Sequence, residues 1–339
     1  MSGRSRGRIA AAGVATAGVL GWGLLVAPGA GAAPELPPVT PEDLVTSVLN
    51  APDPGPLNGT VTLENDLGLP ALPDLPQAAN GTSTARVWSG GDHKGRVQLP
   101  TDGAERTLVS DGTTRWAWNS ADKTVVRGPV DTTRDRGAAP TDPTAAASKA
   151  IADLRATSTI AVDGTATVAG RSAYELVLTP APTERTLLRE VRVAVDSEKR
   201  MPLRLTVLAT GSADPALQVG FTDLTFGPQD PALFTFTPPP GATVTDAPAR
   251  DAQARPDATT VGDGWDAVKI MPKPASTTAT PESPAPDAPD LSAVGTPVTG
   301  TWGSGRLLTS AVGSAILTDD GRVALGAVPE QVLTEALSR

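Results

Sequence analysis

The chain has 339 residues, a formal net charge of −9, a single His and no Cys. Its acidic balance and its lack of a basic block argue against nucleic acid as a partner, because phosphate binding needs clustered Lys or Arg. The absence of Cys excludes disulfides, thiolate metal sites and cysteine nucleophiles, and one His excludes a metal site built on two, so we expect neither a metal nor a cofactor.

The N-terminal residues have the composition of an export signal. Arginines at positions 4, 6 and 8 precede an apolar run over residues 9–27, and Ala30-Gly31-Ala32 supplies the small residues of a cleavage position. This order predicts a secretory signal peptide over residues 1–32. The apolar run is close to the length of a membrane span, so an uncleaved N-terminal anchor is the alternative. In both cases we expect an exported protein, extracytoplasmic or associated with the cell envelope.

Two helix starts are visible further along the chain. Thr40 is a suitable N-cap for a helix that begins with Pro41, and Leu44 and Val48 then belong to a one-sided apolar stripe. The dipeptide Asp142-Pro143 repeats this arrangement, so a second helix is predicted over residues 144–155.

The rest of the body is predicted to be antiparallel sheet. Short apolar runs alternate with turn residues such as Gly90-Gly91-Asp92 and Asp111-Gly112, roughly every 8–12 residues. The alternation slips by one residue at Leu224, which predicts a β-bulge. Strict alternation gives each sheet one apolar and one wet face, which excludes the buried parallel sheet of a doubly wound fold.

Four segments are predicted from these changes in composition. Residues 1–32 are the signal peptide, residues 33–271 the main domain, and residues 272–294 a Pro-rich linker. Residues 295–339 contain a hairpin and a closing helix. They are too few for a core of their own, so we expect this tail to dock on the main domain.

No pattern predicts catalysis, and we expect the protein not to be an enzyme. His93 lies in a turn, and no Gly-x-Ser-x-Gly elbow is present. Acids on separate strands can still meet in space, and a buried cluster of acids with raised pKa values would favour an enzyme.

Several strand segments resemble the LolA/LolB/RseB lipoprotein-carrier superfamily, which includes LolA-like outer-membrane lipoprotein carriers and MucB/RseB-like regulators of the sigma-E response. The segments that carry the resemblance are Tyr174–Leu178, Val191–Asp196, Met201–Leu205, Val219–Leu224 and Phe234–Val244. The resemblance covers about residues 40–246, and the tail is typical of actinobacterial members. It implies an α+β fold: a strongly curved antiparallel sheet, an incomplete β-barrel, with helices covering an apolar cavity on its concave face.

The resemblance also implies a function without covalent chemistry. Members carry lipoproteins or lipids across an aqueous envelope compartment, or sense them and regulate an anti-sigma factor. We therefore expect a lipid- or lipoprotein-binding carrier that holds acyl chains in an apolar cavity. The alternative is an RseB-like regulator that binds an anti-sigma factor or another membrane-bound protein.

Apolar residues of the predicted strands are the candidate cavity walls. The candidates are Trp88, Trp116, Trp118, Leu176, Val193, Leu205 and Phe221. Trp116 and Trp118 share one face of one strand, and ordinary core packing is the alternative interpretation of all three tryptophans. The parity of each strand decides which candidates point inward.

Overall fold

The computed structural model describes residues 33–69, 80–101, 103–130, 152, 154–247, 258–272 and 295–339. The predicted signal peptide and nearly all of the predicted Pro-rich linker lie outside the described residues. Of the predicted second helix, residues 152, 154 and 155 are described and are helical, and the described helix extends to residue 157. No helix within the described ranges is long and apolar enough to cross a membrane.

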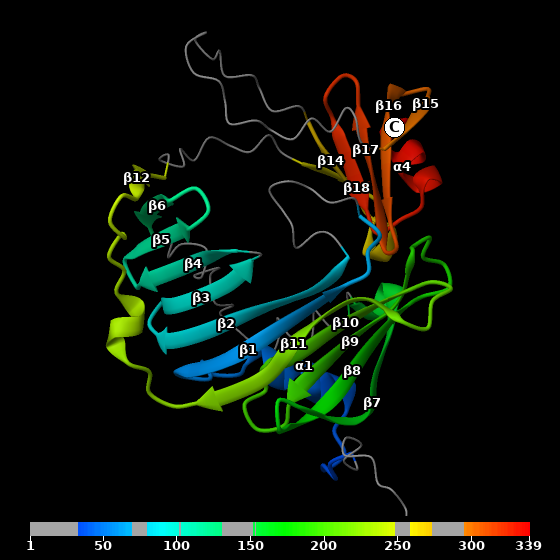
Figure 1. The fold of residues 1–339 in the computed structure, drawn as a ribbon. Helices are drawn as coiled ribbons and strands as arrows, with labels where there is room; N and C mark the ends of the chain where they lie inside the picture. Colours follow the sequence, from blue (N-terminus) through cyan, green and yellow to red (C-terminus); the bar gives the residue numbers. More distant parts are fainter. Residues whose placement is uncertain are drawn as a thin grey trace, which may run out of the picture. The chain divides into compact units, whose positions relative to one another are not determined.

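The first twelve strands form one sheet, which is open and strongly curved (Figure 1). Its spatial order is β12-β6-β5-β4-β3-β2-β1-β11-β10-β9-β8-β7. The strands are β1 (Leu57–Asn65), β2 (Gly81–Gly91), β3 (Lys94–Thr101), β4 (Ala104–Asp111), β5 (Thr114–Asn119), β6 (Thr124–Pro129), β7 (Ser158–Val168), β8 (Arg171–Pro180), β9 (Leu188–Asp196), β10 (Pro202–Ala209), β11 (Pro215–Phe226) and β12 (Thr243–Asp246). Neighbouring strands are antiparallel except β12 and β6, which are parallel. The predicted strongly curved antiparallel sheet is confirmed.

The predicted bulge lies in β11. Phe221 pairs with Val61 of β1 and Asp223 pairs with Thr60, so Thr222 is one residue extra. An extra residue on one strand bends that strand and shifts its alternation. This is why Leu224 returns to the face that Phe221 occupies.

Helix α1 (Pro41–Leu49) packs on strands β7, β8 and β9. The Thr40 hydroxyl accepts a hydrogen bond from the backbone N–H of Asp43 at 3.1 Å, as the sequence predicts for this cap. Leu44 is fully buried in a cluster with Ile160, Tyr174, Leu176 and Val195. The described part of the chain is thus mostly β with few helices, and helices covering the whole concave face stay a prediction.

A second sheet has six strands in the order β13-β14-β18-β17-β16-β15. The strands are β13 (Thr259–Val261), β14 (Val268–Met271), β15 (Thr296–Gly300), β16 (Gly303–Ser310), β17 (Gly313–Thr318) and β18 (Val323–Gly326), and helix α4 (Glu330–Leu337) follows them. Their shared core includes Val268, Ile316 and Leu333.

The boundary predicted at residue 271 therefore divides one sheet. Residues 259–271 were expected in the main domain, but Lys269 of β14 pairs with Leu325 of β18. The physical reason is that β13 and β14 add apolar side chains to a tail that is too short to form a core alone.

Hydrogen bonds and an ion pair join this second sheet and its neighbouring segments to the loop before β9 and to the start of β7. The backbone N–H of Leu187 donates to the Ala327 carbonyl at 2.9 Å, and Arg185 pairs with Glu335 of α4 at 2.8 Å. The Trp265 indole, in the turn η3 (Gly264–Asp266), donates to the Ser158 hydroxyl at 2.7 Å.

A buried carboxylate organises the turn between β9 and β10. Asp196 is fully buried, pairs with Arg171, and accepts backbone N–H bonds from Glu198 at 2.9 Å and Lys199 at 2.6 Å. Burial by itself raises the pKa of Asp196, but the Arg171 guanidinium and the two backbone donors outweigh it, so the pKa lies below its ordinary value.

This carboxylate makes stability depend on pH. A lowered folded-state pKa means that the stabilisation is complete above the unfolded-state value of about 4 and is lost as the pH falls through the folded-state value. Asp196→Asn should lower the free energy of unfolding by about 2–3 kcal/mol at pH 7, and by progressively less below about pH 4. Urea unfolding at several pH values measures this difference.

Glu198→Gln is the matched control, because Glu198 pairs with the same Arg171 at 2.9 Å but is mostly exposed. We expect Glu198→Gln to lower the free energy of unfolding by less than about 1 kcal/mol at pH 7 and also below about pH 4. A difference between Asp196→Asn and the parent that does not change with pH would contradict the assignment.

Candidate functional site

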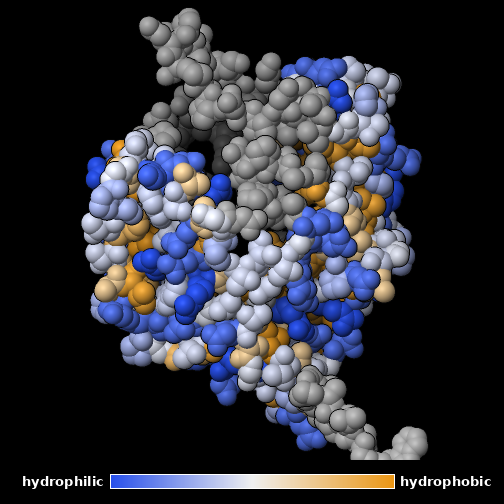
Figure 2. Space-filling model, viewed as in Figure 1, coloured by the Kyte–Doolittle hydropathy of each residue, from blue (hydrophilic) through white to orange (hydrophobic). Residues whose placement is uncertain are grey.

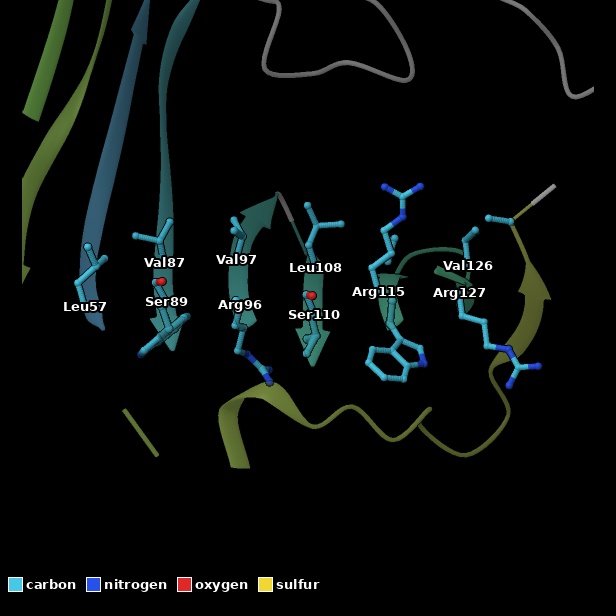
Figure 3. A pocket seen from close by; sticks show the side chains of 17 residues that line it. Leu57, Val87, Ser89, Arg96, Val97, Leu108, Ser110, Arg115, Val126 and Arg127 are labelled. Carbon is cyan, nitrogen blue, oxygen red and sulfur yellow. The ribbon is translucent and has the colours of Figure 1, made fainter. Parts of the chain in front are cut away.

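A cavity of about 650 Å³ lies over strands β2 to β6 (Figure 3). Its volume is within the range of roughly 300–1,000 Å³ that is usual for small-molecule sites. Residues that border it include Leu57, Val87, Val97, Leu108, Ala117, Val126 and Ala247. None of the described residues that border it is Asp or Glu.

The register of the strands builds the apolar row of the cavity. Val87 pairs with Val97, Val97 with Leu108, Leu108 with Ala117, and Ala117 with Val126. Paired residues of an antiparallel sheet project from the same face. Five strands therefore contribute one aliphatic side chain each, and we call these five residues the apolar row.

A second row on the same face leaves the space empty. Two residues along each strand from the apolar row lie Ser89, Gly95, Ser110, Arg115 and Gly128, which we call the small row. Four of these five residues are Gly or Ser, so little side-chain volume fills the space above the sheet. The hollow is thus a direct result of residue size along one register position.

Two residues of the apolar row are open to solvent, and the other three are half-buried. Leu108 is 47% and Val126 is 40% exposed, which is unusual for large aliphatic side chains on a sheet. On the face seen in Figure 2, hydrophilic residues form most of the coloured surface and hydrophobic residues appear in small patches between them. Apolar groups gathered in a hollow therefore mark a candidate binding surface.

The opposite face of the same strands is closed by the chain itself. The short helix η2 (Pro231–Phe234) covers it, and the Arg96 guanidinium donates to the Leu233 carbonyl at 3.4 Å. A Cβ atom on Gly90 would lie 2.6 Å from the Phe234 ring, so β2 and this ring approach as closely as a glycine allows. Figure 3 shows Arg96 pointing away from the side on which Val97 and Leu108 lie.

The three predicted tryptophans belong to this covered face. Trp88 pairs with Arg96, and Val109 pairs with Trp116. Each of these residues is the sequence neighbour of a residue of the apolar row, so it projects from the opposite face. The rings of Trp116 and Phe236 lie 6.3 Å apart. Trp88 and Trp116 border the cavity, but the alternation of their strands directs both side chains to the η2 face. Trp118, on the same face as Trp116, does not border the cavity.

The other four candidates lie on the cavity's face of the sheet but outside the cavity. Leu176 pairs with Val193 and Val193 with Leu205, and this row continues across β11 and β1 to the face of β2 that carries Val87. Leu176 and Val193 pack in the cluster around Leu44 of α1. Phe221 packs in a cluster with Leu57, which borders the cavity.

Sequence reasoning did not single out the apolar row. Its residues are short aliphatic side chains that any strand can contain, and the signal that selects them is their mutual pairing. That pairing follows from the register of five strands, which local alternation alone does not specify.

The described residues offer no metal-binding centre. Among them, no group of three or more His, Asp or Glu side chains is arranged to hold a metal ion. Asp111 ends β4, and hydrogen bonds from the backbone N–H groups of Thr114 and Thr113 lower its pKa. These bonds stabilise the hairpin turn between β4 and β5. The absence of enzymatic activity stays a prediction.

Leu108 and Val109 are adjacent residues that test whether the two faces differ. Val109 is only 2% exposed, whereas Leu108 is about half exposed in the cavity. Val109→Ala should lower the free energy of unfolding by about 2 kcal/mol, because it leaves a void under η2. Leu108→Ala should cost less than about 1 kcal/mol, since solvent already reaches its side chain. Urea unfolding of the two variants measures this, and equal losses would show that the cavity is filled.

No protein-family model matches this chain, and no curated protein is similar to it in sequence. Among solved structures, the chain is similar to a chain of the Pseudomonas aeruginosa MucA/MucB complex, with 19% identity over 88% of this chain and 96% of the other, at a TM-score of 0.45. A structure of MucB in complex with MucA(peri) is 18% identical over 87% and 94% of the two chains, at a TM-score of 0.44. A LolA superfamily protein from Nitrosomonas europaea is 11% identical over 59% of this chain and 99% of the other, at a TM-score of 0.25.

Proposed function

We propose that the protein is an exported, non-enzymatic binding or carrier protein that holds an acyl chain of a lipid or lipoprotein on the concave face of its first sheet. The observation that carries this proposal is the apolar row, where large aliphatic side chains stay exposed in a hollow of about 650 Å³. Export rests on the predicted signal peptide.

An apolar guest supplies the contacts that the apolar row lacks. Burial of each CH₂ group contributes about 0.8 kcal/mol, so even a partly buried chain gains useful affinity. The row runs across five strands, which favours an extended chain over a compact ring system. Because the hollow is open, the guest can enter and leave without unfolding the sheet.

The resemblance found in the sequence supports the same function. Members of that superfamily carry lipids or lipoproteins, and they need a curved sheet with an apolar concave face. The alternative, an RseB-like regulator that binds an anti-sigma factor or another membrane-bound protein, needs an exposed protein-binding surface, with lipid as its signal or absent. The two functions therefore differ in whether binding of a lipid is required.

Filling the hollow should abolish binding of an acyl chain. Ala117 lies in the middle of the apolar row, so Ala117→Trp places a large side chain where the guest would lie. We expect the affinity for a fluorescent fatty acyl probe to fall at least about tenfold, the equivalent of losing about two buried CH₂ groups. Fluorescence titration measures the affinity, and circular dichroism checks the fold.

Thr84→Trp is the matched control, because Thr84 is exposed on the opposite face of β2. We expect its probe affinity to equal that of the parent. If Ala117→Trp binds the probe as tightly as Thr84→Trp does, the hollow is not the binding site.

Protein purified from its native envelope should carry a lipid. Native mass spectrometry is expected to show a mass shift that disappears after exchange with detergent and is absent from Ala117→Trp. A parent protein that shows no adduct, and that binds no acyl probe, would favour the regulator.

A further inference from the structure

Arg115 of β5 places one positive charge beside the apolar row. It pairs with Ser110 of β4 and Gly128 of β6, so it belongs to the small row and projects from the same face as Ala117. Figure 3 shows its side chain extending to the side on which Leu108 and Val126 lie. Residues two apart along a strand are separated by about 7 Å, so the charge lies next to the hydrocarbon site and not within it.

The other two arginines that border the cavity are already engaged. Arg96 donates to the Leu233 carbonyl, and Arg127 pairs with Asp246 of β12 at 2.6 Å. Within the described ranges, Arg115 has neither an ion pair nor a hydrogen bond to a side chain or backbone group. None of the described residues that border the cavity is Asp or Glu. Among these described residues, Arg115 is therefore the one cation without a partner.

The small row also supplies one hydroxyl group beside this cation. Ser110, the residue opposite Arg115, donates its hydroxyl to the His93 carbonyl at 2.6 Å and accepts from the Gly112 backbone N–H at 3.3 Å. Its oxygen keeps one further lone pair that can accept. Ser89 lies in the same row, on β2. The face is thus amphipathic along the strands: aliphatic in the apolar row and polar with a guanidinium in the small row.

We infer that the cavity selects acyl chains that end in an anionic head group, with the head on Arg115 and the chain along the apolar row. This inference rests on the proposed function and names the class of ligand for it. A guanidinium binds a carboxylate or a phosphate through two parallel N–H bonds, so free fatty acids and phosphate-headed lipids share the required chemistry. A neutral head group would gain the hydrocarbon contacts alone.

The test compares charged and neutral probes of equal chain length. The parent protein should bind dodecanoate and dodecyl phosphate about fivefold more tightly than methyl dodecanoate, the gain expected for a partly exposed ion pair. The preference should shrink between 50 mM and 500 mM NaCl, because salt screens exposed charges. Displacement of a neutral fluorescent acyl probe measures all three affinities.

Arg115→Gln should lower the affinity for the two anionic probes to that for the ester and leave the ester unchanged. Arg115→Lys should keep part of the preference, and the ratio of phosphate to carboxylate affinity tells which head group fits better. Arg86→Gln is the control, since Arg86 lies over the Trp88 ring on the opposite face, and it should keep the parent's preference.

Two results would overturn the inference. One is a loss in Arg115→Gln that is equal for the anionic probes and the ester, and the other is no loss at all. Ester binding that survives Arg115→Gln but is lost in Ala117→Trp leaves the proposed function intact. If the parent binds no probe of any kind, the proposed function fails together with this inference.

Discussion

Alternation of side chains along paired strands controls what this sheet can do. In strands β2 to β6, one face carries the apolar row and the small row, and the other carries Trp88, Val109 and Trp116. The chain covers the second face with η2 and Phe236, so its aromatic groups are used in packing. The first face receives no comparable cover from the described residues. A one-residue slip of register would exchange the two faces and would place the tryptophans in the hollow.

The hollow depends on small residues as much as on apolar ones. If the small row carried leucines in place of Gly95 and Gly128, its own side chains would fill the space over the sheet. At the other end of the same face, larger residues such as Leu176 and Tyr174 pack against α1 and leave no comparable gap. One sheet thus contains a packed core at one end and an open hollow at the other. The size of the residues along each row determines whether that part of the face is packed or hollow.

The sequence predicts the local features well and the long-range pairings poorly. The cap at Thr40 and the bulge near Leu224 follow from short patterns, because a cap and a bulge are set by a few adjacent residues. The face of the sheet from which Trp116 projects does not follow from such a pattern, because both faces of this region carry apolar residues. Leu108 and Val109 are neighbours on opposite faces, and the alternation that normally identifies the inner side is absent there.

The second sheet could not be predicted from the sequence for a different reason. Its strands β14 and β15 are separated by the Pro-rich stretch that local composition marks as the end of a domain, yet β14 hydrogen-bonds to β18. The strands before and after that stretch therefore belong to one sheet, not to two separate domains. A protease that cuts the stretch would leave both fragments joined by the β14–β18 ladder, so the nicked protein should migrate whole until it is denatured.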